Sequence, residues 1–299
     1  MRENRPLRPK KRLGQNFLVD KNIRRKIVDS CGFKPGDTVI EIGAGRGELT
    51  GLIAKRVKFI YALEFDTDLC GILKEALAGY PNIKIINQDI IKTNFNIFAA
   101  TAKTKLMVVG NIPYYITTPI IKQLLFYRKK IKNIFLTVQK EFARRVTASA
   151  GSKEYGSLTC FLNYYLEPRI LFIIKKSSFL PAPKVDSCFL SLSPRKPPVK
   201  VKDEELFFNI IRSSFAKRRK TLRNSLEGVV SEQDLDMFFK KYGIDRNIRP
   251  EDLRLEDFAR LTNHISHKEG HQPHKSQESA KRKAENQGYQ SLGVSGHKL

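Results

Sequence analysis

The first half of the chain alternates short apolar runs with segments of helical spacing. Each run is rich in β-branched residues and ends in glycine or a polar side chain, as buried strands do. The run that ends at Ile42 leads through a glycine loop into a helical pattern from Glu48 to Val57. This alternation predicts an α/β fold with a parallel sheet. Strands are expected at residues 38–42, 59–63, 83–86, 105–109, 134–138, 158–166 and 185–192.

The rest of the pattern predicts helices and a change of domain. Asp20 is placed to cap a helix, and Ser231 begins a capping box in the C-terminal part. A Pro- and Lys-rich linker at 195–200 separates the strands from these helices. We therefore expect a basic flexible arm at 1–12, a larger domain at 13–195, a small helical domain at 196–265 and a disordered tail at 266–299.

The segment Gly43-Ala44-Gly45-Arg46-Gly47 joins a strand to a helix, an arrangement that binds nucleotides. Glu64 ends the next strand, 21 residues after Gly43, where its carboxylate can accept both hydroxyls of a ribose. Asp89 follows the third strand and can accept a hydrogen bond from an adenine amino group. The dinucleotide fingerprint would need a glycine at Glu48, so the pattern favours S-adenosylmethionine instead.

The stretch Gly110-Asn111-Ile112-Pro113-Tyr114-Tyr115 ends the fourth predicted strand at the same sheet edge. The Asn111 oxygen and a backbone carbonyl beside Pro113 can accept hydrogen bonds, and Tyr114 offers a flat face for stacking. Together they suit a planar ring with an exocyclic amino group. Phe179, in a proline-rich loop, is either a second stacking face or a core aromatic residue.

The charge of the chain favours a polyanionic partner. Lys and Arg number 55 against 30 Asp and Glu, a formal net charge of +25. A membrane surface is the alternative, but no apolar run approaches the roughly 20 residues that span a bilayer, and no signal peptide is evident. These features predict a soluble, intracellular protein.

Several basic residues are candidate phosphate contacts, although each could instead lie on a solvated surface. They fall in the N-terminal arm, in one helix of the larger domain and in the small helical domain. These RNA-binding candidates are Arg8, Lys10, Lys11, Arg12, Arg144, Arg145, Lys217, Arg218, Arg219, Lys220 and Arg223.

Histidine and cysteine usage argues against a metal site. All five histidines lie between His264 and His297, so the body of the chain has no imidazole for acid–base catalysis or metal binding. The four cysteines are widely spaced and form no Cys-x-x-Cys pair, which favours buried free thiols.

Five motifs resemble those of the KsgA family, the small-subunit (16S) ribosomal RNA adenine dimethyltransferases. The resemblance covers about residues 8 to 263. It implies a Rossmann-like, seven-stranded S-adenosylmethionine-dependent methyltransferase domain followed by a small all-helical domain. The motifs are Gly14-Gln15-Asn16-Phe17-Leu18, Glu41-Ile42-Gly43-Ala44-Gly45-Arg46-Gly47, Gly110-Asn111-Ile112-Pro113-Tyr114-Tyr115, Phe179-Leu180-Pro181-Ala182-Pro183-Lys184-Val185-Asp186-Ser187 and Phe215-Ala216-Lys217-Arg218-Arg219-Lys220-Thr221-Leu222-Arg223-Asn224-Ser225-Leu226.

The resemblance also implies the activity, N6,N6-dimethylation of two adjacent adenosines near the 3′ end of small-subunit rRNA during ribosome assembly. The predicted cofactor-binding residues are Gln15, Asn16, Leu18, Gly43, Gly45, Glu64, Asp89, Ile90 and Asn111. The predicted catalytic residues are Asn111, Pro113, Tyr114 and Phe179. The expected partner is rRNA within the small ribosomal subunit or its precursor, and a cytoplasmic monomer is expected.

Two other functions stay open at this point. A large-subunit (23S) rRNA dimethylase of the macrolide-resistance type shares the Asn-x-Pro-Tyr motif, but the stretches at 179–187 and 215–226 favour the small-subunit family. An RNA-binding assembly factor with a vestigial site is the alternative from another class. A DNA adenine methyltransferase is disfavoured because no extra segment is available to read base sequence.

Overall fold

The computed structural model describes residues 10, 13–217 and 219–266. Most of the predicted arm and all but Ser266 of the predicted tail therefore lie outside the described residues. Contacts divide the chain into two compact units. The first holds the chain up to Arg144 and Leu166–Pro194, and the second holds Arg145–Tyr165 and the chain from Arg195 onward.

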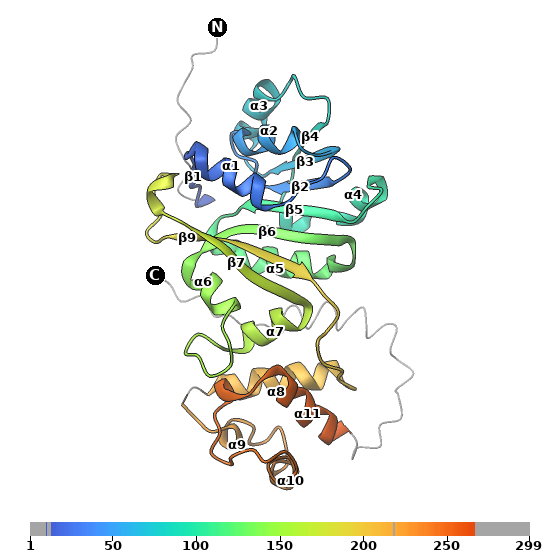
Figure 1. The fold of residues 1–299 in the computed structure, drawn as a ribbon, viewed down its shortest axis with the longest axis vertical. Helices are drawn as coiled ribbons and strands as arrows, with labels where there is room; N and C mark the ends of the chain where they lie inside the picture. Colours follow the sequence, from blue (N-terminus) through green and yellow to red (C-terminus); the bar gives the residue numbers. More distant parts are fainter. Residues whose placement is uncertain (1–9, 11–12, 218, 267–299) are drawn as a thin grey trace. The chain divides into compact units, whose positions relative to one another are not determined.

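The first unit is built on a seven-stranded sheet of the described residues, with the order β4-β3-β2-β5-β6-β9-β7 (Figure 1). The five strands β4, β3, β2, β5 and β6 pair in parallel with their neighbours, whereas β9 runs antiparallel to both β6 and β7. The α/β prediction is confirmed. The strands are β2 (Thr38–Ile42), β3 (Phe59–Glu64), β4 (Ile83–Asn87), β5 (Leu106–Asn111), β6 (Ile131–Gln139), β7 (Leu166–Ile174) and β9 (Ser187–Pro194).

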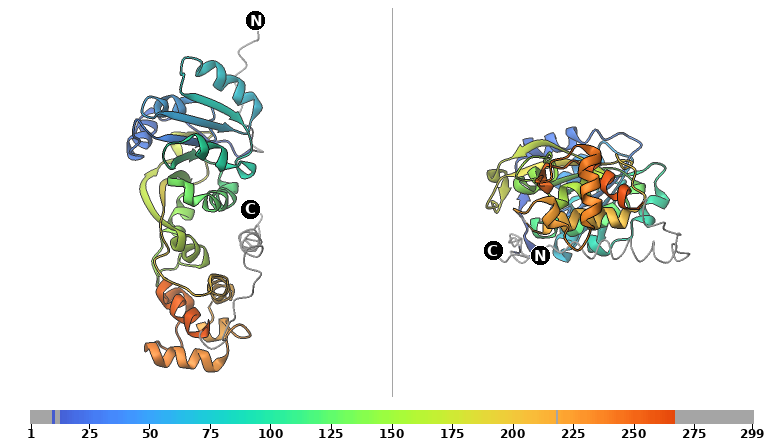
Figure 2. Two further views of the ribbon diagram at one scale, coloured as in Figure 1. Left: turned by 90° about the vertical axis from the view of Figure 1, so that its right-hand side faces the viewer. Right: turned by 90° about the horizontal axis from the view of Figure 1, so that it is seen from below.

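Helices lie on both sides of this sheet (Figure 2). Helix α1 begins where the sequence predicts, because the Asp20 carboxylate accepts hydrogen bonds from the backbone N–H groups of Asn22 and Ile23. Ile27 of α1 and Ile53 of α2 belong to one buried apolar cluster with residues of the sheet. The helices are α1 (Lys21–Ser30), α2 (Glu48–Ala54), α3 (Thr67–Ala76), α4 (Phe95–Thr101), α5 (Thr117–Phe126) and α6 (Lys140–Val146), with 3-10 turns η2 (Ile90–Lys92), η3 (Tyr114–Ile116), η4 (Arg128–Lys130) and η5 (Lys176–Ser178).

One predicted strand is wrong. Residues 158–165 belong to helix α7 (Ser157–Tyr165), and the strand begins only after it, as β7. Six residues of α7 are buried, among them Cys160, Phe161 and Tyr164, so the segment has no polar face to reveal a helical period. Its aromatic content then mimics that of a strand.

The second unit is helical, as predicted for the C-terminal part. Helix α10 begins at the expected cap, where the Ser231 hydroxyl accepts from the backbone N–H of Asp234. Phe207, Phe238 and Phe258 are fully buried and form its core. Its helices are α7, α8 (Glu204–Ala216), α9 (Leu222–Ser225), α10 (Glu232–Tyr242) and α11 (Leu255–Ser266), with the turn η6 (Pro250–Asp252). Residues 145–165 belong to this second unit, whereas the sequence analysis places them in the larger domain.

A short two-stranded sheet joins two motifs that lie far apart in the sequence. Strand β1 (Phe17–Leu18) pairs antiparallel with β8 (Phe179–Leu180), with Leu18 opposite Phe179. The Val19 N–H also donates to the Ser178 carbonyl over 2.9 Å. The N-terminal segment is therefore fixed to the loop that precedes β9.

Buried groups in the first unit include a carboxyl in the middle of the sheet. Glu41 of β2 is 2% exposed, and its Oε2 atom has no hydrogen-bond partner among the described residues. Burial, with the nearby charge of Glu64 as a smaller cause, raises the pKa of Glu41 to about 8. Glu41 is therefore mostly a neutral acid at pH 7. The four cysteines are free and buried, as the sequence predicts.

We predict that Glu41→Gln flattens the pH dependence of stability. Between the ordinary pKa of 4.5 and about 8, the folded chain binds more protons at this site than the unfolded chain. The wild-type free energy of unfolding should therefore fall as pH rises from 5 to 8, by up to about 1.4 kcal/mol per pH unit from this group. Urea unfolding at three pH values in this range checks the difference. Parallel profiles for the two proteins would contradict the prediction.

Candidate active site

A cavity of about 270 Å³ opens at the carboxyl ends of β2, β3 and β5, within the first unit. Ile42 pairs with Leu63 on one side and with Gly110 on the other, so the residues that follow these three strands meet at one edge. Ten predicted site residues line the cavity: Gln15, Asn16, Gly43, Gly45, Glu64, Asp89, Ile90, Asn111, Pro113 and Tyr114.

The glycine loop follows β2 and adopts a backbone that only glycine adopts without strain. Gly43, Gly45 and Gly47 have φ values of 73°, 60° and 83°. The Gly43 N–H donates to the Leu63 carbonyl over 2.8 Å, which ties the loop to the end of β3. Without Cβ atoms, Gly43 and Gly45 leave the backbone open to close approach by a ligand.

Glu64 ends β3 and is already held by backbone donors. Its Oε2 accepts from the Gly45 N–H and its Oε1 from the Asp66 N–H, both over 2.9 Å. Burial raises the pKa of Glu64, and these hydrogen bonds oppose that shift. Each oxygen keeps a second lone pair, so the fixed carboxylate can accept the two hydroxyls of a ribose.

Asp89 and Ile90 follow β4. One Asp89 carboxylate oxygen accepts from the Ile91 N–H over 2.9 Å and so starts the turn η2. Ile90 is buried and contributes an apolar wall. A carboxylate held beside an apolar wall suits the amino edge and the flat face of an adenine.

Asn111, at the end of β5, is oriented by a residue 95 positions away. Its side-chain nitrogen Nδ2 donates to the Asn16 backbone carbonyl over 2.9 Å. The other side-chain atom, Oδ1, is therefore the acceptor that Asn111 offers to a ligand. The Asn16 side chain in turn donates to the Gly14 carbonyl over 3.3 Å. The N-terminal segment thus forms part of the site.

The residues after Asn111 form a tight turn that fixes Tyr114. The Pro113 carbonyl accepts from the Ile116 N–H over 3.2 Å, which leaves the Ile112 carbonyl as the better candidate acceptor. The Tyr114 hydroxyl shares a hydrogen bond with the buried Ser187 hydroxyl. Burial also raises the pKa of Tyr114, so its hydroxyl stays protonated at neutral pH.

Leu18 and Phe179, two predicted site residues, do not line the cavity. Both side chains are buried in the same apolar cluster, and Phe179 is 3% exposed. The structure therefore places Phe179 in the core, which is the alternative that the sequence left open. Its use as a stacking face stays a prediction.

The cavity also has walls that the sequence analysis missed. Phe65 and Tyr115 line it and are 60% and 63% exposed. Phe65 directly follows Glu64, and Tyr115 directly follows Tyr114. Their position next to a predicted site residue could have indicated that they line the cavity. Gln88, which precedes Asp89, also lines the cavity.

The predicted RNA-binding cations have different surroundings. Lys10 forms ion pairs with Asp66 and Asp68, and Arg223 pairs with Asp236. Five others are exposed: Arg144, Arg145, Lys217, Arg219 and Lys220. Four lie outside the described residues: Arg8, Lys11, Arg12 and Arg218.

Comparison with known proteins identifies the family. A family model described as ribosomal RNA adenine dimethylase matches residues 7–267 of this chain. The chain belongs to this family. The adenine dimethylase match spans both units, so it covers the cavity and the helical part together.

Named relatives of this dimethylase are similar over most of their length. A protein of Geobacillus thermodenitrificans named ribosomal RNA small subunit methyltransferase A is 43% identical over 263 residues, which cover 85% of this chain and 90% of the relative. A protein of the same name from Clostridium botulinum is 42% identical over 257 residues, covering 85% and 93%.

Solved structures share the fold of this dimethylase. A dimethyladenosine transferase from Plasmodium falciparum superposes with a TM-score of 0.72 and 26% identity, covering 85% of this chain and 98% of the other. The 23S rRNA methyltransferase ErmE superposes with a TM-score of 0.69 and 26% identity, covering 84% and 100%.

S-adenosylmethionine is the cofactor of this dimethylase, and the cavity fits it. Gly43 and Gly45 leave room at the loop, Glu64 offers acceptors for ribose hydroxyls, and Asp89 offers one for the adenine amino group. The cofactor supplies a methyl group on a positively charged sulfur, and the cavity edge carries the carboxylates of Glu64 and Asp89. Among the described residues, no group of three or more His, Cys, Asp or Glu side chains could hold a metal ion.

We predict that Gly110→Ala deforms this site. A Cβ atom there would lie 2.8 Å from the Ile42 carbonyl oxygen, so β2 and β5 would have to separate at the edge that carries Gly43 and Asn111. Stability should fall by about 1–3 kcal/mol, and binding of S-adenosylhomocysteine should weaken. Thermal unfolding and calorimetry measure both effects.

Gly71→Ala is the matched control for this substitution. Gly71 lies inside α3, and its added Cβ would have no neighbour within 4 Å. This variant should be as stable as wild type or up to about 1 kcal/mol more stable. Equal behaviour of the two variants would disprove the role assigned to Gly110.

Proposed function

We propose that this protein transfers methyl groups from S-adenosylmethionine to N6 of two adjacent adenosines near the 3′ end of small-subunit rRNA, giving N6,N6-dimethyladenosine. Family membership and the shared name of the curated relatives support the reaction and the substrate. The observation that carries the mechanism is the hydrogen bond from the Asn111 Nδ2 atom to the Asn16 carbonyl, because it makes Oδ1 the acceptor atom that Asn111 offers to a ligand.

The chemical obstacle lies in the acceptor. The lone pair of adenine N6 is delocalised into the ring, so the amino group is a poor nucleophile. We assign the two hydrogens of N6 to the Asn111 Oδ1 atom and the Ile112 carbonyl. Accepting both hydrogens draws the nitrogen toward tetrahedral geometry and aims its lone pair at the methyl group. Positioning and electrostatics would then supply the rate.

Tyr114 is the proposed stacking surface for the target base. Its hydroxyl is held by Ser187 and its backbone carbonyl accepts from the Thr117 hydroxyl over 3.0 Å, so both ends of the residue are fixed. A base must leave its RNA stack to enter such a pocket, and a fixed aromatic ring replaces part of the lost stacking. Phe179 could join it only after moving out of the core.

The alternatives have less support. ErmE, a 23S rRNA methyltransferase, is 26% identical, whereas the small-subunit relatives reach 42–43%. A vestigial site would not need to keep its glycine loop, Glu64, Asp89 and Asn111 together around one cavity. In the described part of the chain no helix could cross a membrane. We further propose a monomer that acts in the cytoplasm, where small subunits are assembled.

We predict that Asn111→Ala lowers turnover by about 100- to 1,000-fold, because one of two acceptors for N6 is lost. The affinity for S-adenosylhomocysteine should change by less than about fivefold, or 1 kcal/mol. Single-turnover methylation and calorimetry separate the two quantities. Asn96→Ala, an exposed position on α4, is the control. Near-normal methylation by Asn111→Ala would rule out the assignment.

Mapping of methylated adenosines tests substrate and site together. Purified small and large ribosomal subunits that lack the modification are incubated with the protein and labelled cofactor. We expect label only in the small subunit, at two adjacent adenosines near the 3′ end of its rRNA. Label in the large subunit would favour the macrolide-resistance type. Cofactor binding without methylation of either subunit would favour an assembly factor.

A further inference from the structure

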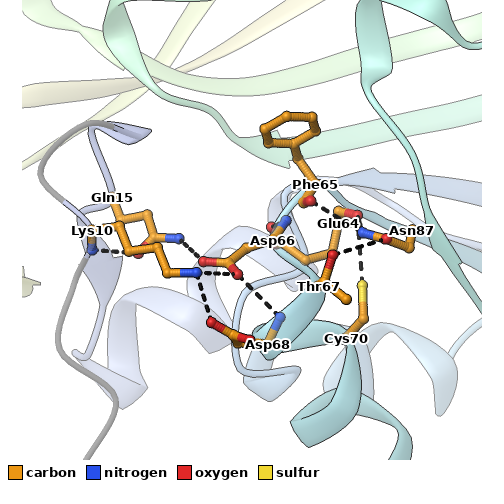
Figure 3. Close-up of polar contacts among 9 residues, drawn as sticks. All are labelled: Lys10, Gln15, Glu64, Phe65, Asp66, Thr67, Asp68, Cys70 and Asn87. Atoms are coloured by element: carbon orange, nitrogen blue, oxygen red, sulfur yellow. Dashed lines mark hydrogen bonds and ion pairs between the residues drawn. The ribbon is translucent and has the colours of Figure 1, made fainter.

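Lys10 binds the acidic turn that follows β3 (Figure 3), and Glu64 and Phe65, at the start of this turn, line the cofactor cavity. Its Nζ atom lies 2.7 Å from the Asp66 Oδ1 and 2.8 Å from the Asp68 Oδ2. The Asp66 side chain is only 3% exposed, so the Lys10–Asp66 pair is partly buried, whereas the Asp68 side chain is 66% exposed. The sequence analysis expected Lys10 to contact RNA phosphate.

Gln15 completes the connection. Its Oε1 accepts from the Lys10 backbone N–H over 2.8 Å, and its Nε2 donates to the Asp66 Oδ2 over 3.1 Å. Both carboxylate oxygens of Asp66 are therefore bound by the N-terminal segment. We call the group of Lys10, Gln15, Asp66 and Asp68 the N-terminal clasp.

The clasp connects directly to the cofactor site. The Asp66 N–H donates to the Glu64 carboxylate that is assigned to the ribose. On the other side, Gln15 and Asn16 line the cavity, and the Asn16 carbonyl orients Asn111. Residues 14–16 are thus held by the clasp through Gln15, and they lead directly into β1, which pairs with β8.

The charges around the clasp favour the contact between Lys10 and the two aspartates. Glu64, Asp66 and Asp68 place three carboxylates within five residues, and Lys10 is the cation that faces two of them. Burial alone would raise the pKa of Asp66, but hydrogen bonds from Lys10 and Gln15 outweigh it and leave that pKa lowered. The hydrogen bonds of Lys10 to Asp66 and Asp68 raise the pKa of Lys10. Both partners therefore stay charged at neutral pH.

We propose that Lys10 is a positioning residue of the S-adenosylmethionine site: through the clasp it holds residues 13–16 as one wall of the cavity and, through Asn16, sets the direction of Asn111. This inference rests on the cofactor and does not depend on which rRNA is methylated. Two of the three donor hydrogens of Lys10 already serve carboxylates, which leaves at most one for a phosphate contact.

The first test compares Lys10→Met, Lys10→Arg and Lys21→Met by calorimetry with S-adenosylhomocysteine. Lys21 is an exposed residue at the start of α1 and is the control. Lys10→Met should weaken binding about tenfold, because charge-assisted bonds are lost next to Asp66. Lys10→Arg should restore affinity to within about threefold, since a guanidinium can bridge both carboxylates.

The second test exchanges the charges. Lys10→Asp should weaken cofactor binding more than Lys10→Met, because it adds a fourth carboxylate beside Glu64. Adding Asp68→Lys to Lys10→Asp should recover at least a third of the lost binding free energy, since the new lysine again faces Asp66. If the single substitution only destabilised the fold, a second substitution would weaken cofactor binding further. Recovery of cofactor affinity in the double variant therefore supports a positioning role. Circular dichroism establishes that each variant is folded.

RNA binding distinguishes the proposal from a phosphate contact. We expect Lys10→Met to raise the KM for S-adenosylmethionine and leave the salt dependence of RNA affinity close to that of wild type. Unchanged cofactor affinity in Lys10→Met would overturn the proposal. So would a variant that changes only in RNA binding, with lower RNA affinity and a smaller salt dependence of that affinity. Absence of methylation on any rRNA, with the expected cofactor affinities intact, would count against the proposed function and not against the clasp.

Discussion

Parallel pairing of β2 with β3 and β5 is the constraint on which the site depends. Because these strands run in the same direction, their carboxyl ends meet at one sheet edge, and each end carries one chemical group. Gly43, Glu64 and Asn111 come from three separate stretches of sequence and become neighbours only through this pairing. Strand β9 is antiparallel, so its amino end lies at this edge, where Ser187 pairs with Gln139 at the carboxyl end of β6.

Three polar groups of the site are oriented by a second segment of chain. Glu64 is held by the glycine loop, Asn111 by Asn16, and the Tyr114 hydroxyl by Ser187. Groups held in this way need little reorganisation when a substrate arrives, which is the main contribution a protein can make to methyl transfer. The N-terminal segment is therefore part of the candidate site, and the 179–187 loop pairs with it.

Charge is distributed unevenly around this site. The chain is strongly basic, yet the turn after β3 is acidic, with Glu64, Asp66 and Asp68 close together. An acidic edge suits a cofactor whose sulfur carries a positive charge, whereas an RNA backbone would be repelled from it. Lys10 neutralises part of this negative charge through its ion pairs with Asp66 and Asp68. A basic residue in an RNA-binding protein is therefore not necessarily a phosphate contact.

The five strands β2, β3, β4, β5 and β6 and the polar residues at their ends could be predicted from the sequence, because β-branched runs, glycine loops and strand-end polar residues are local patterns. The surroundings of other residues depended on contacts between distant parts of the chain. Helix α7 has few exposed residues, so its sequence shows no helical period. Phe179 lies in the core because β8 pairs with β1. Lys10 contacts Asp66 only in the folded chain. Such contacts join positions tens of residues apart, so no window of sequence contains both partners.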